Sequence, residues 1–244
     1  MSMNTSQKDT IPEFERTVEC VFCIDCSADM APRMDAVRGV VKTLISESLK
    51  GWIRNDVVVG GYRAKIIAFR NYETDGADAM SQSRWFDLFS DDVKEFDACL
   101  NSLQASGGAD ANNGLEALFY AMTTDWGGCG DKDRQIIVLL SNTDVVPLGA
   151  HAHLPHYPAH MVDGDGLLCT WMCYRPDFLD KEHFKLKERR KRMCLYGLAG
   201  SAYERMAADY NRCQFIPVSG DSGFSDEDVK DVFRVIAVGG AAAL

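Results

Sequence analysis

The sequence predicts an α/β fold, a three-layer Rossmann-like open sheet that is mainly parallel and has helices on both faces. Short and almost uninterrupted apolar runs, such as 136–140, are typical of strands buried on both faces. Segments with apolar residues at three- and four-residue spacing alternate with these runs, as they do in β-α-β units. No internal repeat or Pro-rich linker divides the 244 residues. Together, these observations favour one domain in which ligands bind at the carboxyl ends of the strands.

The first half of the chain begins with a polar leader, residues 1–16, and a buried strand over Thr17–Ile24. An apolar stripe from Met34 to Leu49 predicts a long helix, which Gly51 should end. Two strand signals follow, at 57–61 and 64–69, and residues 71–83 are interpreted as a polar loop with short strand pairing at most. The remaining elements expected in this half are two helices, over 90–103 and 113–126.

The second half begins with the clearest buried strand, 135–140, and then becomes irregular over about 148–191. We interpret this stretch as an insertion in a single domain that spans 17–240, with a short helix near 167–174. The elements expected after it are strands at 193–198 and 214–218 and helices at 202–210 and 226–237.

Charge and hydropathy exclude several classes of partner and location. The formal net charge of −10 disfavours nucleic acid and anionic lipid as partners. No apolar run approaches the roughly 18 residues of a membrane span. The leader lacks the apolar core of a signal peptide, so we expect a cytoplasmic protein. One segment, 181–192, carries seven basic residues and two acids, and we interpret it as a solvated helical face or linker rather than an anion site.

Nine cysteines are an odd number, which favours reduced thiols over a disulfide framework. Cys20, Cys23 and Cys26 resemble a metal-binding run by spacing. However, they lie in or beside a predicted strand, where Cys20 and Cys23 point to opposite faces. We therefore expect small buried apolar side chains rather than a metal centre.

Three loops at predicted strand ends resemble the von Willebrand factor A domain, in its stand-alone bacterial intracellular form. The first is Asp25-Cys26-Ser27-Ala28-Asp29, which follows the first strand and is similar to the family's Asp-x-Ser-x-Ser loop. The second is the Gly-rich 106–113 loop before a Gly-Leu-Glu-Ala-Leu helix, and the third is Ser141-Asn142. The resemblance covers most of the chain and implies the fold predicted above.

This resemblance also implies a metal-ion-dependent adhesion site in degenerate form. Its family holds one divalent cation, usually Mg²⁺, with Ca²⁺ or Mn²⁺ as substitutes. Three positions depart from the family pattern: Asp29 stands in place of a serine, and Asn112 and Asn142 stand where acids are usual. An asparagine keeps the oxygen but loses the charge that compensates dehydration of the ion. The residues implied as metal ligands are Asp25, Ser27, Asp29, Asp110, Asn112 and Asn142.

Two interpretations of this site remain open: a weakened Mg²⁺ site and a metal-free relic. Asp25, Ser27 and Asp110 also suit the capping of helices and turns. The resemblance implies a non-enzymatic protein-binding or scaffold module, whose partner presents an acidic residue if metal is bound. The oligomeric state is not predicted.

Other functions have weaker support. A metal-free module could use another surface, such as the basic segment 181–192 or the histidine-rich loop 151–160. A His/Cys metal hydrolase is disfavoured because the four histidines of that loop match no His-Glu-x-x-His or zinc-finger spacing. No Gly-x-Gly-x-x-Gly, P-loop or Gly-x-Ser-x-Gly motif follows the first strand, so we expect no enzyme.

Overall fold

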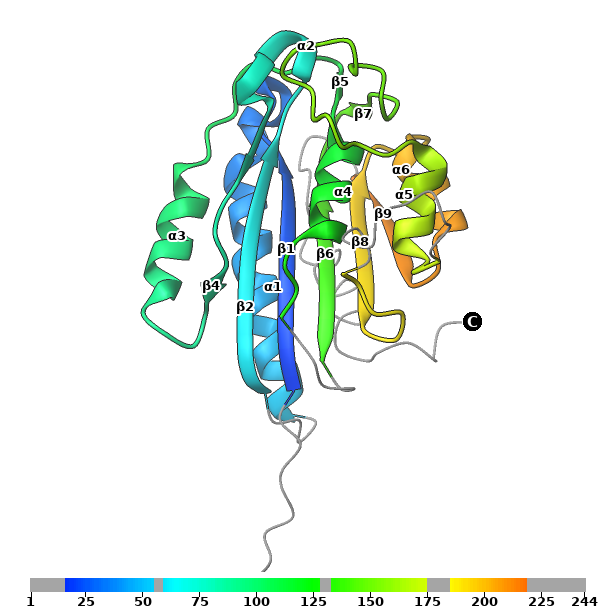
Figure 1. Ribbon diagram of the computed structural model, residues 1–244. Coiled ribbons are helices and arrows are strands. Elements are labelled where there is room, and N and C mark those ends of the chain that lie inside the picture. Colours follow the sequence, from blue (N-terminus) through cyan, green and yellow to red (C-terminus); the bar gives the residue numbers. More distant parts are fainter. Residues whose placement is uncertain (1–15, 55–58, 128–132, 175–184, 219–244) are drawn as a thin grey trace, which may run out of the picture.

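The structure, a computed structural model, describes residues 16–54, 59–127, 133–174 and 185–218. Within these ranges seven strands form one sheet in the order β3-β2-β1-β6-β8-β9, with β4 paired to β2 (Figure 1). The neighbours β2-β1-β6-β8-β9 are all parallel, and only β3 and β4 run antiparallel to β2. The predicted mainly parallel α/β sheet is therefore confirmed. The strands are β1 (Arg16–Asp25), β2 (Val59–Phe69), β3 (Met80–Gln82), β4 (Phe86–Asp87), β6 (Arg134–Leu140), β8 (Lys191–Gly197) and β9 (Cys213–Pro217).

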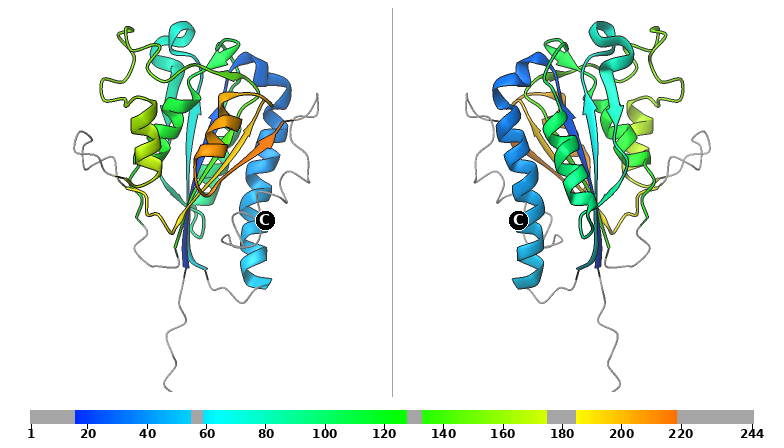
Figure 2. Two further views of the ribbon diagram at one scale, coloured as in Figure 1. Left: turned by 90° about the vertical axis from the view of Figure 1, so that its right-hand side faces the viewer. Right: turned by 90° about the vertical axis from the view of Figure 1, so that its left-hand side faces the viewer.

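Helices cover both faces of the sheet, as the two side views show (Figure 2). The helices α1 (Met34–Arg54) and α3 (Asp92–Ser102) cover one face. The helices α4 (Gly114–Thr123), α5 (Gly164–Trp171) and α6 (Ala202–Asp209) cover the other. Each face has its own apolar core, because alternate residues of the buried strands point to opposite sides. Cys20 packs in the α1 core and Cys23 in the α4 core, which confirms that these two thiols face opposite ways.

Several predicted boundaries were wrong. The helix α1 continues through Gly51 to Arg54, since one interior glycine costs a helix only about 1 kcal/mol. The two strand signals before residue 70 belong to one continuous strand, β2. The predicted polar loop 71–83 contains two helical turns that were not predicted, α2 (Tyr72–Asp75) and a 3-10 helix (Gly76–Ala79), and its only strand is the short β3, which agrees with the short pairing expected there. The leader 1–15 and the expected helix 226–237 lie outside the described residues.

The end of the basic segment is buried, contrary to the prediction of a solvated linker. Lys191 and Arg192 are the first residues of β8 and are 0% and 4% exposed. The Lys191 ammonium donates to the carbonyl of Trp171, forms an ion pair with Glu188 and lies 4.7 Å from the centre of the Trp171 ring. These contacts replace the water that a buried ammonium loses. Lys185, Lys187 and Arg189 remain exposed.

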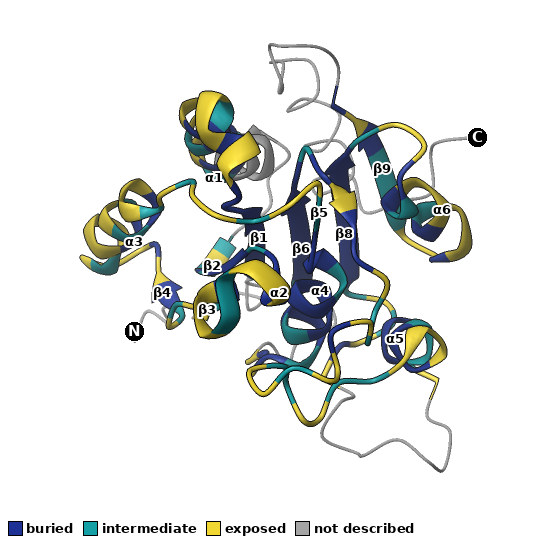
Figure 3. Cartoon of the chain, turned by 90° about the horizontal axis from the view of Figure 1, so that it is seen from above, coloured by how far each residue is buried: buried dark blue, intermediate teal, exposed yellow. Residues whose placement is uncertain are grey.

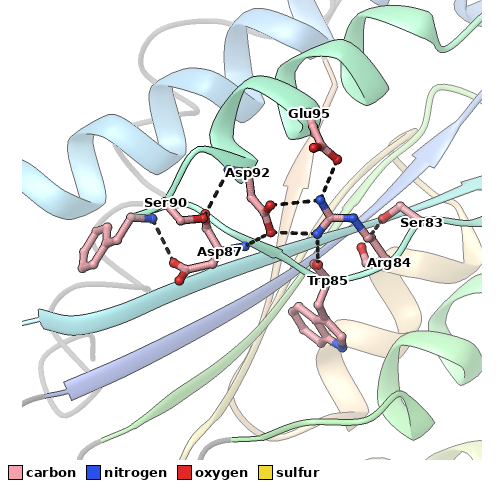
Figure 4. A network of polar contacts seen from close by, with 8 residues as sticks. Ser83, Arg84, Trp85, Asp87, Ser90, Asp92 and Glu95 are labelled. Carbon is pink, nitrogen blue, oxygen red and sulfur yellow. Dashed lines mark hydrogen bonds and ion pairs between the residues drawn. The ribbon is translucent and has the colours of Figure 1, made fainter.

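An exposed ion-pair network fixes the connection from β3 to α3 (Figure 4). The Arg84 guanidinium donates to both oxygens of Asp92, at 2.7 and 3.0 Å, and to Glu95 at 2.7 Å. Asp92 also accepts from the backbone N–H of Asp87. Arg84 lowers the pKa of the Asp92 carboxyl, mainly through these hydrogen bonds. The positive charge of Arg84 is thus matched by two carboxylates.

The described residues include no helix with the length and apolar character that a membrane span requires.

We expect Lys191→Ala to lower the free energy of unfolding by about 1–3 kcal/mol, because the buried Trp171 carbonyl loses its charged donor and retains only the weak donor of the Cys173 thiol. Urea denaturation followed by circular dichroism measures this change. Arg189→Ala is the matched control at an exposed position of the same segment, and we expect it to stay within about 0.5 kcal/mol of the wild type. Equal stability of the two variants would contradict the structural role of Lys191.

Candidate functional site

The carboxyl ends of β1, β2 and β6 meet at one edge of the sheet, which Figure 3 shows from above. Backbone hydrogen bonds fasten the loops of this edge to one another. Ser106 donates to the Cys26 carbonyl, Ala28 donates to the Gly107 carbonyl, and Asn113 donates to the Arg70 carbonyl. The short parallel strands β5 (Ala111–Asn112) and β7 (Asp144–Val145) also pair here. We call the assembled loops the strand-end face, defined as residues 25–29, 70–79, 104–113 and 141–146.

The Asp25 carboxylate lies at the centre of this face and is fully buried. Its Oδ1 accepts a hydrogen bond from the backbone N–H of Ser27 at 2.9 Å. Its Oδ2 accepts from two hydroxyls that follow β6, Ser141 Oγ at 2.8 Å and Thr143 Oγ1 at 2.7 Å. Thr143 in turn accepts from the amide nitrogen of Asn112 at 3.0 Å. One buried carboxylate therefore links the loops after β1, β5 and β6.

Ser27 and Asn112 both lie close to Gly108 of the Gly-rich loop. A Cβ atom at Gly108 would lie 2.4 Å from Ser27 Cβ and 3.0 Å from Asn112 Oδ1, and the residue has a φ of +74°. Both the space and the backbone conformation therefore require glycine. The Ser27 hydroxyl is buried without a hydrogen-bond partner in the described structure. The Asn112 side chain also exchanges hydrogen bonds with the backbone of Ala109.

The other three implied ligands lie at the rim of the face. Asp29 and Asp110 are exposed, and Asn142 is partly buried. Within the described residues, no hydrogen bond joins any of these three side chains to Asp25 or Ser27. The structure thus brings Asp25, Ser27 and Asn112 into close contact and leaves the other three side chains outside the hydrogen-bond network of Asp25.

Sequence reasoning missed Ser141 and Thr143, which carry the hydroxyls on Asp25. Their alternation around Asn142, directly after a buried strand, is the signal that could have identified them. It also missed Asn113, whose Oδ1 accepts from the Tyr72 backbone at 2.8 Å and lies 3.1 Å from His151 Nδ1. His151 is buried, unlike the exposed His153, His156 and His160 of the same loop.

A second buried carboxyl, Glu116, anchors the histidine-rich loop to helix α4. Its Oε1 accepts from the Tyr157 hydroxyl at 2.8 Å, and that hydroxyl accepts from the Gly149 backbone at 3.0 Å. Burial raises the pKa of Glu116, and the hydrogen bond from Tyr157 offsets part of this rise. The loop that follows β7 is therefore tied to a helix behind the face.

The oxygen ligands available at this face fit a divalent cation poorly. Mg²⁺ requires six oxygens in octahedral geometry and draws its affinity from carboxylates. Here the single buried carboxylate, Asp25, already accepts three hydrogen bonds, and the Asn112 amide is engaged within its own loop. Only the Ser27 hydroxyl is buried and unengaged among the implied ligands. Across the described ranges, no group of three or more His, Cys, Asp or Glu side chains is arranged to hold a metal.

Comparisons with known proteins support the fold but name no family. No protein-family model matches the sequence, and no curated protein matches it. Among solved structures, the pilus adhesin SpaC from Lactobacillus rhamnosus GG has a similar fold, with a TM-score of 0.50 and 13% identity. The match covers 91% of this chain and 30% of the adhesin chain.

A second structure of SpaC, in its open conformation, matches with a TM-score of 0.47 and 14% identity over the same shares of both chains. This chain thus spans less than a third of the length of the adhesin. At such low identity, the similarity at the higher TM-score shows the shared fold alone.

We expect Gly108→Ala to lower the free energy of unfolding by about 1–3 kcal/mol, because a side chain at this positive φ is strained and meets Ser27. Thermal and urea denaturation measure the loss. Gly149→Ala is the matched control, since Gly149 also has a positive φ, +84°, but no atom lies within 4 Å of its added Cβ. A smaller loss at Gly108 than at Gly149 would contradict the close approach of the two loops.

We expect no saturable binding of Mg²⁺, Ca²⁺ or Mn²⁺ at millimolar concentration, because the oxygens of Asp25 are engaged by protein donors. Isothermal calorimetry on chelator-treated protein tests this, with Asp25→Asn as the reference. Saturable heat that disappears in Asp25→Asn would show instead that the hydroxyls rearrange to admit a metal.

Proposed function

We propose that this chain is a non-enzymatic protein-binding or scaffold module resembling the von Willebrand factor A domain, and that it binds its partner through the strand-end face. The observation that carries the proposal is the fastening of three strand-end loops by backbone hydrogen bonds and by Asp25. A face held in one conformation loses less conformational entropy on binding than separate mobile loops do.

The exposed side chains of the face are suited to contact a partner. Asp29 and Asp110 lie in two loops and Asp144 lies in β7, and all three are exposed, whereas the residues that engage Asp25 are buried. Binding rather than catalysis is supported by the polar contacts. Among the described residues, no serine or cysteine side chain is hydrogen-bonded to a histidine, which is the arrangement that activates a nucleophile.

The proposal includes a cytoplasmic location and an acidic group on the partner. The eight described cysteines are all unpaired, which suits a reducing compartment. The pilus adhesin contributes one precedent, that a protein with this fold takes part in adhesion. A metal ion is not required in this proposal, since the hydroxyls and the amide around Asp25 hold the loops together.

We expect the double variant Asp29→Lys and Asp110→Lys to lose its partner, because it reverses two exposed charges that would face basic or polar groups of the partner beside its acidic group. The variant should retain the wild-type melting temperature, because in the described structure neither side chain forms a hydrogen bond or an ion pair. Chemical crosslinking and mass spectrometry on the chain captured from its source cells measure the partner recovered and the crosslinked residues.

Arg189→Glu is the matched control, since it reverses an exposed charge at the opposite edge of the sheet. Loss of the partner in Arg189→Glu but not in the double variant would move the interface to the basic segment and overturn the proposal.

A further inference from the structure

A cavity of about 300 Å³ opens at one side of the strand-end face. Its wall is formed by the end of β2, by the turn before β3 and by the end of α3, and Cys26 and Arg70 also line it. This volume is at the lower limit of small-ligand pockets, which span roughly 300–1,000 Å³, and is enough for one inserted side chain. All the residues that line it lie within the described ranges.

Arg70 supplies the positive charge of this cavity and holds three loops at once. Its Nε donates to the Cys26 carbonyl at 3.0 Å, one terminal nitrogen donates to the Asp78 carbonyl at 3.2 Å, and the other donates to the Gln104 carbonyl at 3.0 Å. A guanidinium has five N–H donors, so two N–H groups remain, one on each terminal nitrogen. They suit the two oxygens of a carboxylate.

The charge of Arg70 is not matched by a carboxylate in the described structure. Its three partners are neutral carbonyl oxygens, and it forms no ion pair within 4 Å there. Arg84 provides the contrast, because two carboxylates bind its guanidinium. The other arginine near the cavity, Arg38, donates to the Leu103 carbonyl and is paired with Asp35. Arg70 is therefore the cation that an incoming anion meets.

Two acidic groups lie near this cavity and define which anion fits. Asp25 is buried behind it and is engaged by its own donors. Asp78 lies in the wall with an exposed side chain. The pKa of the Cys26 thiol is affected by the same charges: burial and, to a smaller extent, Asp25 raise it, Arg70 and Arg38 lower it, and the result is a pKa of about 12. A single free positive charge beside one acid suits a monovalent carboxylate better than a divalent phosphate.

We propose that Arg70 is the residue that receives the acidic side chain of the partner protein, in the cavity at the ends of β2 and α3. The inference rests on the proposed function and deepens it, because it assigns to an arginine the positive charge that a metal ion supplies in the resembled family. The partner is thus a protein that presents an exposed Asp or Glu on a loop or terminus narrow enough to enter the cavity.

The test uses N-acetyl-aspartate N-methylamide as the probe and follows the arginine Nε–Hε signals of the ¹⁵N-labelled full chain by NMR. We expect a saturable shift of the Arg70 signal with a dissociation constant of about millimolar. The isosteric asparagine probe should cause no such shift, and the Arg84 signal should not move. No saturable shift at Arg70, or equal shifts with both probes, would overturn the proposal.

Charge variants sharpen the test without altering the Arg70 contacts. Asp78→Asn removes a nearby negative charge but retains the backbone carbonyl that Arg70 binds, so we expect it to tighten probe binding about twofold to fivefold. Asp91→Asn is the matched control, because Asp91 is an equally exposed acid near the other end of α3. Identical affinity of the two variants would contradict the proposal.

Replacement of the arginine itself gives the last comparison. Arg70→Lys retains the charge but lacks the planar fork, and we expect it to weaken probe binding by at least about tenfold. If this variant fails to fold, the two probes and the two Asp→Asn variants still test whether Arg70 binds a carboxylate. Partner recovery that depends on Asp29 and Asp110, together with no binding of the aspartate probe at Arg70, would retain the proposed interface and reject Arg70 alone.

Discussion

The buried Asp25 carboxylate is the constraint on which the strand-end face depends. A buried carboxylate without donors is costly, so the surrounding chain must supply them. Ser27, Ser141 and Thr143 do so from two loops, and Asn112 connects a third loop through Thr143. The position of these loops therefore follows from the need to solvate one charge inside the protein. The same solvation leaves the carboxylate little capacity for an external ion.

Asp25 is the last residue of β1 and is in register with Phe69, the last residue of β2, which Arg70 follows. Their side chains have opposite roles at the same edge. The carboxylate is turned inward and is engaged by hydroxyl and amide donors, whereas the guanidinium lies at a cavity and is held by carbonyl oxygens. One charge organises the loops, and the other remains available at the surface that they form.

The sequence allowed the sheet, its mainly parallel order and the opposite facing of Cys20 and Cys23 to be predicted, because buried strands have a period that is visible in the residues themselves. The structure also brings Asp25, Ser27 and Asn112 together, as the strand-end argument expected.

The features that could not be predicted depend on contacts between residues that are far apart in the sequence. No local pattern shows that Lys191 is buried against Trp171, or that Arg70 reaches three backbone carbonyls from separate loops. Helix α1 continues past Gly51 because one interior glycine costs a helix only about 1 kcal/mol. The sequence also could not show that Asp29 and Asp110 are exposed, because the geometry of their loops sets the exposure of these side chains.

The two cysteines of β1 give each layer of this protein its own chemical reporter. Cys20 lies in the core beneath α1 and Cys23 in the core beneath α4, and burial raises the pKa of both thiols. Because only the thiolate reacts readily, alkylation or oxidation of either sulfur requires its helix layer to open first. The order in which the two sulfurs become modified therefore records which side of the sheet opens first as the protein unfolds.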